Sequence, residues 1–335
     1  MSEIRRILVI HVTRIGDTLL ATPALRAIAA AHPQAEITCL AHPKRAEVLH
    51  HLPFLARVGS INKQRALWCG HLPGRHYDLA FVFGYDKPLV TYALRVARRV
   101  VAFRQNEPAL DQRLDPCVEP PPPGRHGAAA LLALPEAIGI QPVGMRLSYR
   151  VTDAEAHWAS DFLAARLSAD AVPLIGLQVA SFPTKAWRDW PIENFIALCQ
   201  RILAAWPQSH FLIFGGSREH ERTGTLKKRL GAHATLLAGQ LRLRQTAALM
   251  SRLDLYIGVD TGPTHIMGCF DIPLIALYHC QSPSRRFAPL EHPLLHAIDH
   301  PRPEAECSFA TPMAEISVER VWQEVGLALA GSSHV

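Results

Sequence analysis

The sequence predicts an α/β protein made of two doubly wound parallel sheets. Short β-branched runs alternate with helical segments along both halves of the chain, which is typical of parallel strands with helices on both faces. At 335 residues the chain exceeds the usual size of one hydrophobic core, so two domains are expected. Hydrophobic residues make up 49% and charged residues 19%, a balance that suits large buried sheets and argues against disorder.

The expected strands fall into two groups, one in each half of the chain. In the first half they are "RILVIHV" (6–12), "EITCLAH" (36–42) and "DLAFVFG" (78–84), with helices over 23–33 and 87–99. In the second half they are "PLIGLQV" (173–179), "HFLIFGG" (210–216), "LDLYIGV" (253–259) and "PLIALYH" (273–279), with helices over 192–206 and 244–253.

A boundary between the domains is expected between Tyr149 and Ala171. The proline run at 120–123 predicts a stiff exposed loop, and 127–140 predicts one more helix before the boundary. Apolar residues at helical spacing predict a last helix from Ser317, which could pack on either domain. The predicted divisions are an N-terminal domain over 1–160, a C-terminal domain over 171–316, and a C-terminal helix and tail over 317–335.

Charge and cysteine content restrict the class of protein. The net charge of +6, with 18 further His, predicts a surface that attracts anions. No basic run is long enough for a nucleic-acid arm, so no nucleic-acid partner is expected. The seven Cys contain no Cys-x-x-Cys, and the His pairs lack metal-ligand spacing, so neither a disulfide framework nor a metal is expected. After Arg5 and Arg6 the apolar run is only strand-length, which predicts a cytoplasmic protein without a signal peptide or membrane span.

The first candidate site loop follows the first strand. Gly16 and Asp17 lie between that strand and a helix, where a carboxylate can cap free backbone N–H groups. The helix has its own start signal, however, with Thr22 as a candidate N-cap and Pro23 at its first position. Asp17 is therefore less needed as a cap and is a candidate for chemistry.

Two further loops follow strands of the second half. Ser181, Thr184 and Lys185 place two hydroxyls and a cation after the strand at 173–179, with Trp187 and Trp190 expected to fill core. The turn at 260–265 is built of small residues and opens a helix, which suits a phosphate group, although it also fits an ordinary capped turn. In open α/β sheets ligands bind at the carboxyl ends of strands, so a site is expected in the cleft between the domains.

Other phosphate-binding motifs are missing. The sequence contains neither G-x-x-x-x-G-K-[ST] nor a G-x-G-x-x-G after the first strand, so the P-loop and the dinucleotide fingerprint are not present. The glycine-rich turn at 214–221 is weak evidence alone. Glu219 in it could bind a ribose hydroxyl or cap a helix, and the cap is the favoured interpretation.

Three stretches together resemble the family 9 glycosyltransferases, the lipopolysaccharide heptosyltransferases. They are "ILVIHVTRIGDTLLATPALRAI", "TKAWRDWPIENFIAL" and "LYIGVDTGPTHIMGCFDIPLIALY", in the family's order. The resemblance implies a GT-B architecture, in which two Rossmann-like domains face each other across a cleft, the first holding the acceptor and the second the nucleotide sugar. It implies an inverting, metal-independent and cofactor-free transfer of heptose from ADP-L-glycero-D-manno-heptose to the lipopolysaccharide inner core. The missing signal peptide predicts a place at the cytoplasmic face of the inner membrane, and the basic surface is expected to help peripheral attachment to anionic lipid.

The resemblance also implies roles for individual residues. Asp17, between Gly16 and Thr18, matches the catalytic base, and Lys185 matches the cation at the donor phosphates. Asp260 matches a residue that positions the sugar or Lys185. The remaining matches are to the donor site: Ser181 near the phosphates, Thr261, Gly262 and His265 in the phosphate loop, and Leu241 near the adenine. From the residues of the same loops, Thr184, Pro263, Thr264 and Glu219 are further substrate-binding candidates.

The chain also departs from the family pattern. His279 and Cys280 stand where many members have Gly-Pro, and residues 104–126 are individual to this chain. Acceptor choice is expected to involve basic residues of the first domain, which would suit a phosphorylated core. These are Lys63, Arg65, Arg98 and Arg104.

Three alternatives remain open. One keeps the fold and mechanism but uses another nucleotide sugar or acceptor. Another is a nucleotide-sugar-binding protein without turnover, against which the presence of both Asp17 and Lys185 counts. The third is a nicotinamide oxidoreductase, suggested by the Rossmann-like alternation and opposed by the missing fingerprint.

Overall fold

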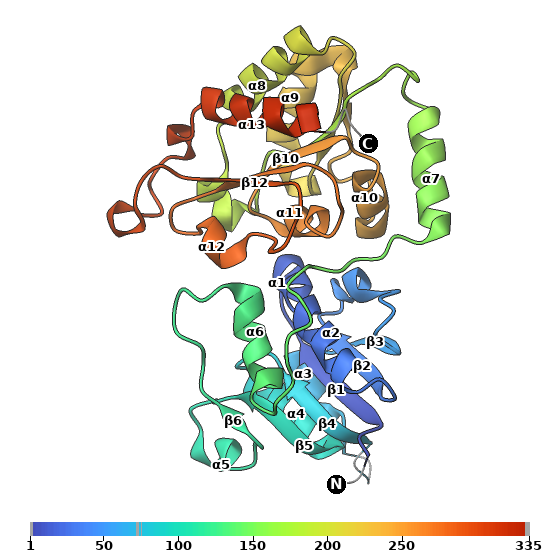
Figure 1. The fold of residues 1–335 in the computed structure, drawn as a ribbon, viewed down its shortest axis with the longest axis vertical. Coiled ribbons are helices and arrows are strands. Elements are labelled where there is room, and N and C mark those ends of the chain that lie inside the picture. The colour runs from blue at the N-terminus through green and yellow to red at the C-terminus, as the bar shows by residue number, and fades with distance from the viewer. Residues whose placement is uncertain (1–2, 72–73, 75, 332–335) are drawn as a thin grey trace. The chain divides into compact units, whose positions relative to one another are not determined.

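The computed structural model describes residues 3–71, 74 and 76–331. They form two units, divided between Arg150 and Val151 (Figure 1). Each unit contains a six-stranded sheet in which every strand pair is parallel. Two doubly wound α/β units are therefore present, as the sequence predicts.

The first unit has strand order β3-β2-β1-β4-β5-β6. Its strands are β1 (Arg6–His11), β2 (Glu36–Ala41), β3 (Arg57–Ser60), β4 (Tyr77–Val82), β5 (Ala97–Phe103) and β6 (Cys117–Val118). Its helices are α1 (Ile15–Leu20), α2 (Thr22–Ala31), the 3₁₀ turn η1 (Ala46–Leu49), α3 (Lys63–Trp68), α4 (Lys87–Val96), α5 (Pro108–Asp111) and α6 (Gly127–Glu136). The order reverses between β1 and β4, so the loops that leave these two strands diverge and open a crevice at their carboxyl ends.

The second unit repeats this topology, with strand order β12-β11-β10-β7-β8-β9. Its strands are β7 (Leu174–Gln178), β8 (His210–Phe214), β9 (Ala234–Leu236), β10 (Leu255–Val259), β11 (Leu274–Tyr278) and β12 (Leu295–Asp299). Its helices are α7 (Asp153–Ala164), α8 (Ile192–Ala205), α9 (His220–Leu230), α10 (Leu243–Met250), α11 (Gly262–Met267), α12 (Ser284–Phe287) and α13 (Val318–Gly331). Short 3₁₀ segments complete it: η2 (Pro183–Arg188), η3 (Ser217–Glu219), η4 (Gly231–His233), η5 (Glu304–Glu306) and η6 (Met313–Glu315).

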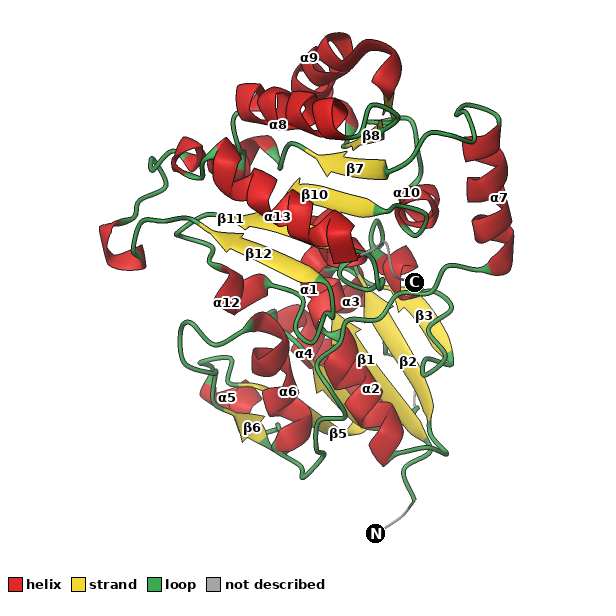
Figure 2. Ribbon diagram, turned by 45° about the horizontal axis from the view of Figure 1, so that its top comes forward, coloured by secondary structure: helices red, strands yellow, loops and turns green. Residues whose placement is uncertain are grey.

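The seven strands expected from the sequence are confirmed, each within two residues of its expected ends. The strands that sequence reasoning missed are β3, β5, β6, β9 and β12, most of them short or at a sheet edge. β5 was hidden because α4 ends at Val96 and the strand begins at Ala97 without a loop, so residues 97–99 were assigned to the helix. Figure 2 shows the alternation of strand and helix in each unit.

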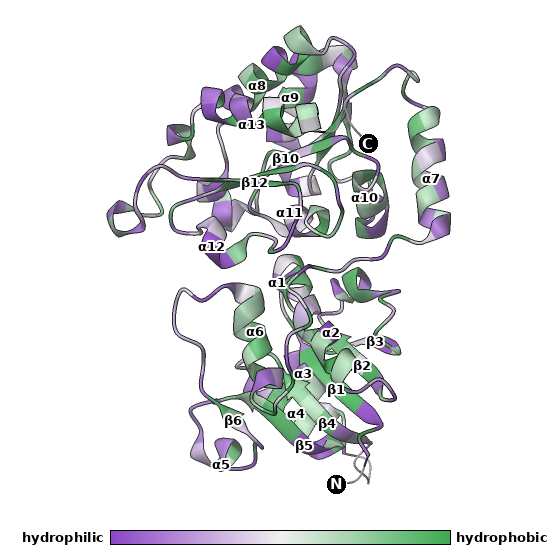
Figure 3. Cartoon of the chain, in the orientation of Figure 1, coloured by the Kyte–Doolittle hydropathy of each residue, from purple (hydrophilic) through white to green (hydrophobic). Residues whose placement is uncertain are grey.

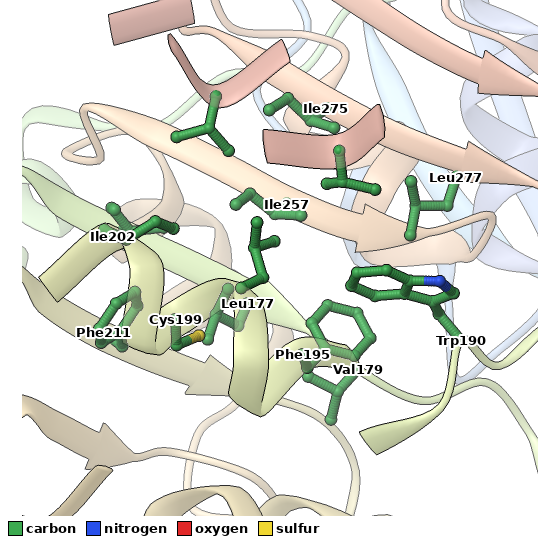
Figure 4. Packing of buried hydrophobic residues seen from close by; sticks show 14 of the residues in the cluster. Leu177, Val179, Trp190, Phe195, Cys199, Ile202, Phe211, Ile257, Ile275 and Leu277 are labelled. Atoms are coloured by element: carbon green, nitrogen blue, oxygen red, sulfur yellow. The ribbon is translucent and has the colours of Figure 1, made fainter. Parts of the chain in front are cut away.

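The core of the second unit lies between its sheet and the helices α8, α9 and α13. Trp190 is fully buried against Phe195, with ring centroids 5.0 Å apart, and its indole nitrogen donates to the carbonyl of Ile316 at 2.8 Å (Figure 4). Val321 and Val325 of α13 belong to the same cluster. The predicted last helix is therefore confirmed, and it covers the second unit. Figure 3 shows the apolar strands at the centre of each unit.

α7 corrects the predicted division at residue 160. The helix begins with a capping box, in which Thr152 accepts from the amide of Glu155 and the Glu155 carboxylate accepts from the amide of Thr152. The same carboxylate takes two hydrogen bonds from Arg244 of α10, at 2.5 and 2.6 Å. These bonds lower the pKa of Glu155 to about 2. They fasten α7 to the second unit, which a boundary placed by composition alone cannot reveal.

Among the described residues, no helix has the length and apolar character needed to cross a membrane.

Candidate functional site

Asp17 stands in the first turn of α1, directly above the carboxyl end of β1. Its carboxylate accepts a hydrogen bond from the hydroxyl of Thr13 at 3.1 Å. The N-cap residue of α1 is Arg14, which makes no side-chain capping bond, and in the described structure no backbone N–H donates to the Asp17 carboxylate. The carboxylate is half-buried and is thus placed for contact with a ligand rather than for helix capping.

The loop around Asp17 is held from several directions. Arg45 donates to the carbonyl of Thr13 at 2.8 Å, and the buried hydroxyl of Thr18 donates to the carbonyl of Arg14 at 2.7 Å. Gly16 is buried within the turn. Thr18 and Gly16 therefore shape the loop, and their predicted role in substrate binding stays a prediction.

The predicted N-cap role of Thr22 is wrong. The chain is already helical at Ile15, and Thr22 is the first residue of α2, preceded by Ala21 in helical conformation. The Thr22 hydroxyl donates backwards to the carbonyl of Leu19 at 2.6 Å and accepts from the amide of Ser148 at 3.0 Å. The sequence pattern marked a break between two short helices, not the start of one.

In the second unit, the loop after β7 carries Ser181, Thr184 and Lys185. The Ser181 hydroxyl donates to the carbonyl of Lys185 at 2.7 Å, so its hydrogen is used within the loop instead of pointing to a ligand. Thr184 is exposed. Lys185 is half-buried, with its ammonium nitrogen 5.5 Å from the centroid of the Trp187 ring, and among the described residues no carboxylate pairs with it. Lys185 is therefore a cation available to an anionic ligand.

Arg188 is a candidate site residue that sequence reasoning missed. Its guanidinium lies 2.9 Å from the carboxylate of Asp260, which is buried at the end of β10, and 4.8 Å from the centroid of the Trp187 ring. Its buried Nε has no hydrogen-bond partner in the described structure. The available signal was the Asp-Trp-Pro that follows it, because Trp190 is a fixed core residue at the start of α8 and holds the preceding chain in place.

Asp260 joins the loops that follow three neighbouring strands. Its carboxylate pairs with Arg188 from the loop after β7 and accepts from the Ser282 hydroxyl, after β11, at 2.8 Å. Asp260 itself follows β10. A buried carboxylate that contacts both a cation and a hydroxyl donor is held in one orientation. It is suited to hold Arg188 in place.

The turn after Asp260 contains buried side chains that support it and half-buried residues beside them. The Thr264 hydroxyl is buried and donates to the carbonyl of Val259 at 2.6 Å, so its side chain supports the turn. His265 is also buried, with Nδ1 2.9 Å from the carbonyl oxygen of Thr261. Nδ1 therefore donates, and Nε2 is an acceptor that lacks a partner in the described part of the chain. Thr261, Gly262 and Pro263 are half-buried beside it.

The remaining predicted donor residues lie after β8 and β9. The carboxylate of Glu219 accepts from the amide of Gly216, so the favoured capping interpretation is confirmed. Burial raises the pKa of Glu219. Leu241 is half-buried in the loop before α10. Its position near an adenine, and a ribose contact by Glu219, stay predictions.

The structure corrects the cysteine prediction. Cys280 and Cys307 form a disulfide, with Cα atoms 5.9 Å apart, although the sequence gives no paired spacing. The fold brings the loop after β11 beside the segment after β12. His279 Nδ1 and the two sulfurs lie within 4.8 Å of one another. Because the sulfurs are joined and Nδ1 accepts from the amide of Gln281 at 3.0 Å, these groups are already occupied within the protein.

The basic residues expected to select the acceptor are mostly paired. Lys63 lies 2.5 Å from Asp86, Arg98 is 3.8 Å from Asp78, and Arg104 pairs with Glu119. Within the described ranges, exposed Arg65 has no carboxylate at ion-pair distance. These pairs reduce the positive charge that an acceptor would meet, which leaves Arg65 as the strongest of the four candidates.

Comparison with known proteins agrees with this geometry. The model of glycosyltransferase family 9 (heptosyltransferase) matches residues 136–312. The lipopolysaccharide core heptosyltransferase of Haemophilus influenzae is 22% identical over 324 residues, covering 92% of this chain and 88% of the relative. Lipopolysaccharide heptosyltransferase 2 of Salmonella typhimurium is 26% identical over 320 residues, covering 87% of this chain and 86% of the relative.

Solved structures show the same fold. A family 9 glycosyltransferase from Veillonella parvula matches with a TM-score of 0.83 at 19% identity, covering 99% of both chains. The ADP-heptose lipopolysaccharide heptosyltransferase II of Escherichia coli matches with a TM-score of 0.82 at 20% identity, covering 98% of this chain and 99% of the other. The GT-B fold class predicted from the sequence is confirmed. Since the family model spans more than half of the chain, the protein belongs to glycosyltransferase family 9, the heptosyltransferases, and is a glycosyltransferase.

Proposed function

We propose that this glycosyltransferase transfers heptose from ADP-L-glycero-D-manno-heptose to the inner core of lipopolysaccharide, with inversion at the anomeric carbon and without a metal or cofactor. The observation that carries the proposal is the pair of cations at the Trp187 ring, Lys185 and Arg188, of which Arg188 pairs with the buried carboxylate of Asp260. Two cations and one carboxylate leave a net positive charge, which suits a diphosphate. The activities named for the relatives support the choice of heptose and lipopolysaccharide.

A residue of the first unit activates the acceptor hydroxyl. Asp17 accepts the proton of an acceptor hydroxyl while that oxygen attacks the anomeric carbon of the donor. A carboxylate is a weak base toward a sugar alcohol, so proton transfer accompanies bond formation and the placement of Asp17 matters more than its basicity. The bond between the anomeric carbon and the acceptor oxygen forms while the bond between that carbon and the diphosphate breaks on the opposite face of the sugar. The proton of the acceptor hydroxyl remains on Asp17.

Residues of the second unit stabilise the departing diphosphate. Negative charge grows on ADP as the bond breaks, and preorganised cations stabilise that charge. Lys185 supplies an unpaired ammonium, and Arg188 retains an Nε–H without a partner in the described structure. His265 Nε2 offers an acceptor to a hydroxyl or N–H of the ligand. These cations perform the charge neutralisation that a divalent ion performs in metal-dependent transferases.

Calorimetric titration with ADP, UDP and GDP tests the donor assignment. We expect selective ADP binding by the wild type, and weaker binding by Lys185→Ala and Arg188→Ala. Arg201→Ala is the matched control, because Arg201 is a half-buried arginine of α8 that pairs with Glu319. A preference for UDP or GDP would retain the fold and reject the heptose donor. Equal ADP binding by the wild type, Lys185→Ala and Arg188→Ala would reject Lys185 and Arg188 as the cations that bind the diphosphate.

We propose also that the protein works at the cytoplasmic face of the inner membrane, as a peripheral protein. Trp68 is 83% exposed and Leu67 is 54% exposed at the end of α3, on the same helix as Lys63 and Arg65. An exposed indole beside cationic side chains is typical of attachment to anionic lipid. Co-sedimentation with vesicles that contain anionic phospholipid should be weaker for Trp68→Ser, and equal sedimentation of the two proteins would contradict this placement.

A further inference from the structure

His11, the last residue of β1, lies directly beneath Asp17. It is 6% exposed. Its Nδ1 lies 2.8 Å from the carbonyl oxygen of Phe83, and its Nε2 lies 3.0 Å from the carbonyl oxygen of Asp17. One ring thus joins the end of β1 to the loop after β4 and to the first turn of α1.

The Asp17 carbonyl needs such a partner because α1 is short. A helix leaves its last carbonyls without intrahelical donors, and a histidine can supply the missing bond. Here the amide of Ala21, four residues after Asp17, bonds the carbonyl of Thr18 at 3.3 Å. The Asp17 carbonyl oxygen instead has His11 Nε2 at 3.0 Å, and a hydrogen on that nitrogen completes the bond.

Asp17 is consequently fixed at both of its polar ends. His11 holds the backbone carbonyl, and Thr13 holds the carboxylate at 3.1 Å. Thr13 is itself held by Arg45, whose guanidinium donates to the Thr13 carbonyl at 2.8 Å. The His11 bond sets the height of the first turn of α1 above the end of the sheet, and the carboxylate moves with that turn.

We infer that His11 is a positioning residue for glycosyl transfer, which fixes the backbone of Asp17 so that its carboxylate meets the acceptor hydroxyl. The inference rests on the proposed role of Asp17 as the base. A displaced base loses rate steeply, because an error near 1 Å in a catalytic group can cost about 100-fold. Since donor binding belongs to the second unit, the effect of His11 falls on turnover and not on affinity for ADP.

A packing role is the competing explanation, since the His11 ring also meets the edge of the Phe83 ring at a centroid distance of 5.7 Å. His11→Phe separates the two roles, because phenylalanine keeps an aromatic ring of similar size and removes both ring nitrogens. His11→Gln restores donors on one side-chain nitrogen. The matched control is His32→Phe, a half-buried histidine in the same unit whose Nε2 makes no hydrogen bond in the described structure.

Steady-state transfer and ADP calorimetry on these variants test the inference. We expect His11→Phe to lower kcat about 10- to 100-fold, with the donor KM and the ADP affinity unchanged, and His11→Gln to recover at least part of the loss. His32→Phe should match the wild type. Wild-type kcat in His11→Phe, or a loss that glutamine does not reduce at all, would overturn the positioning role.

A spectroscopic measurement covers the case in which His11→Phe does not fold. Nitrogen-15 NMR of the wild-type imidazole should show a hydrogen on Nε2, the nitrogen that faces the Asp17 carbonyl. A ring with a bare Nε2 would overturn the inference whatever the kinetics. Asp17→Asn separates the two hypotheses: if that variant keeps full activity, Asp17 is not the base and the proposed mechanism fails, while the Nε2 signal still reports the His11 bond.

Discussion

Asp17 and Asp260 follow central strands that are not equivalent in the two units, since β1 corresponds to β7 and β10 corresponds to β4, and their surroundings differ. Each follows a central strand of a sheet with the same strand order. Asp17 is half-buried, its carboxylate bonds a neutral hydroxyl, and no described cation lies within ion-pair distance of it. Asp260 is buried against Arg188 and Ser282. A carboxylate without a cation can accept a proton during reaction, whereas one locked to a guanidinium serves to orient it. The topology provides the position, and the neighbouring side chains decide the chemistry.

The largest effect should come from Asp17→Asn. The amide keeps the shape of the side chain and its bond with Thr13, but it cannot take the proton of the acceptor. We expect kcat to fall at least about 100-fold, with ADP affinity unchanged, in a steady-state transfer assay with calorimetry alongside. Substantial turnover by Asp17→Asn would contradict the proposed difference in role between Asp17 and Asp260.

Arg188→Ala should have the next largest effect, and it changes the surroundings of Asp260. The substitution leaves the buried carboxylate of Asp260 without its cation, which costs about 3 kcal/mol of folding free energy. ADP affinity should also fall about 10-fold, because one of two phosphate cations is lost. Chemical denaturation and calorimetry measure the two effects. Arg188→Lys, which keeps the charge, should recover part of both losses.

Lys185→Ala should weaken ADP binding by a similar factor without a change in stability, since no described carboxylate depends on that ammonium. ADP calorimetry measures the loss of affinity, and chemical denaturation measures the stability of the variant. If Lys185→Ala destabilised the protein as strongly as Arg188→Ala, the distinction between a free cation and a paired one would be wrong.

The smallest effect concerns a carboxylate outside both sites. Glu155 has its pKa lowered to about 2 by Arg244, against an ordinary value of 4.5. Because the folded pKa lies below the unfolded one, this pair stabilises the protein above about pH 4.5, and the contribution disappears as the pH falls toward 2. Arg244→Ala should lower the free energy of unfolding by about 1–2 kcal/mol at pH 7 and by much less near pH 2. An equal loss at both pH values in urea titrations would contradict the assignment.

The central strands could be predicted from the sequence because burial on both faces makes each of them a continuous apolar run. The edge strands β3, β6 and β9 are short, so they carry no such signal. The disulfide between Cys280 and Cys307 could not be predicted either, since it depends on how two loops meet at the end of the sheet.

The positions of the candidate loops were predicted better than the contacts of their side chains. Residue types after strands located the loops of Asp17, Lys185 and Asp260 correctly at the carboxyl ends of β1, β7 and β10. Sequence alone could not show that the Ser181 and Thr264 hydroxyls bond backbone carbonyls of their own unit, because hydrogen-bond direction depends on tertiary geometry.

The most direct test of the proposed function is transfer onto a lipopolysaccharide core acceptor, measured with ADP-heptose, UDP-sugar and GDP-sugar donors in the presence of EDTA. We predict that heptose is transferred from the ADP donor, that the UDP and GDP donors are poor, and that chelation leaves the rate unchanged. Transfer from a UDP- or GDP-linked sugar, or a rate abolished by EDTA and restored by a divalent ion, would contradict the account.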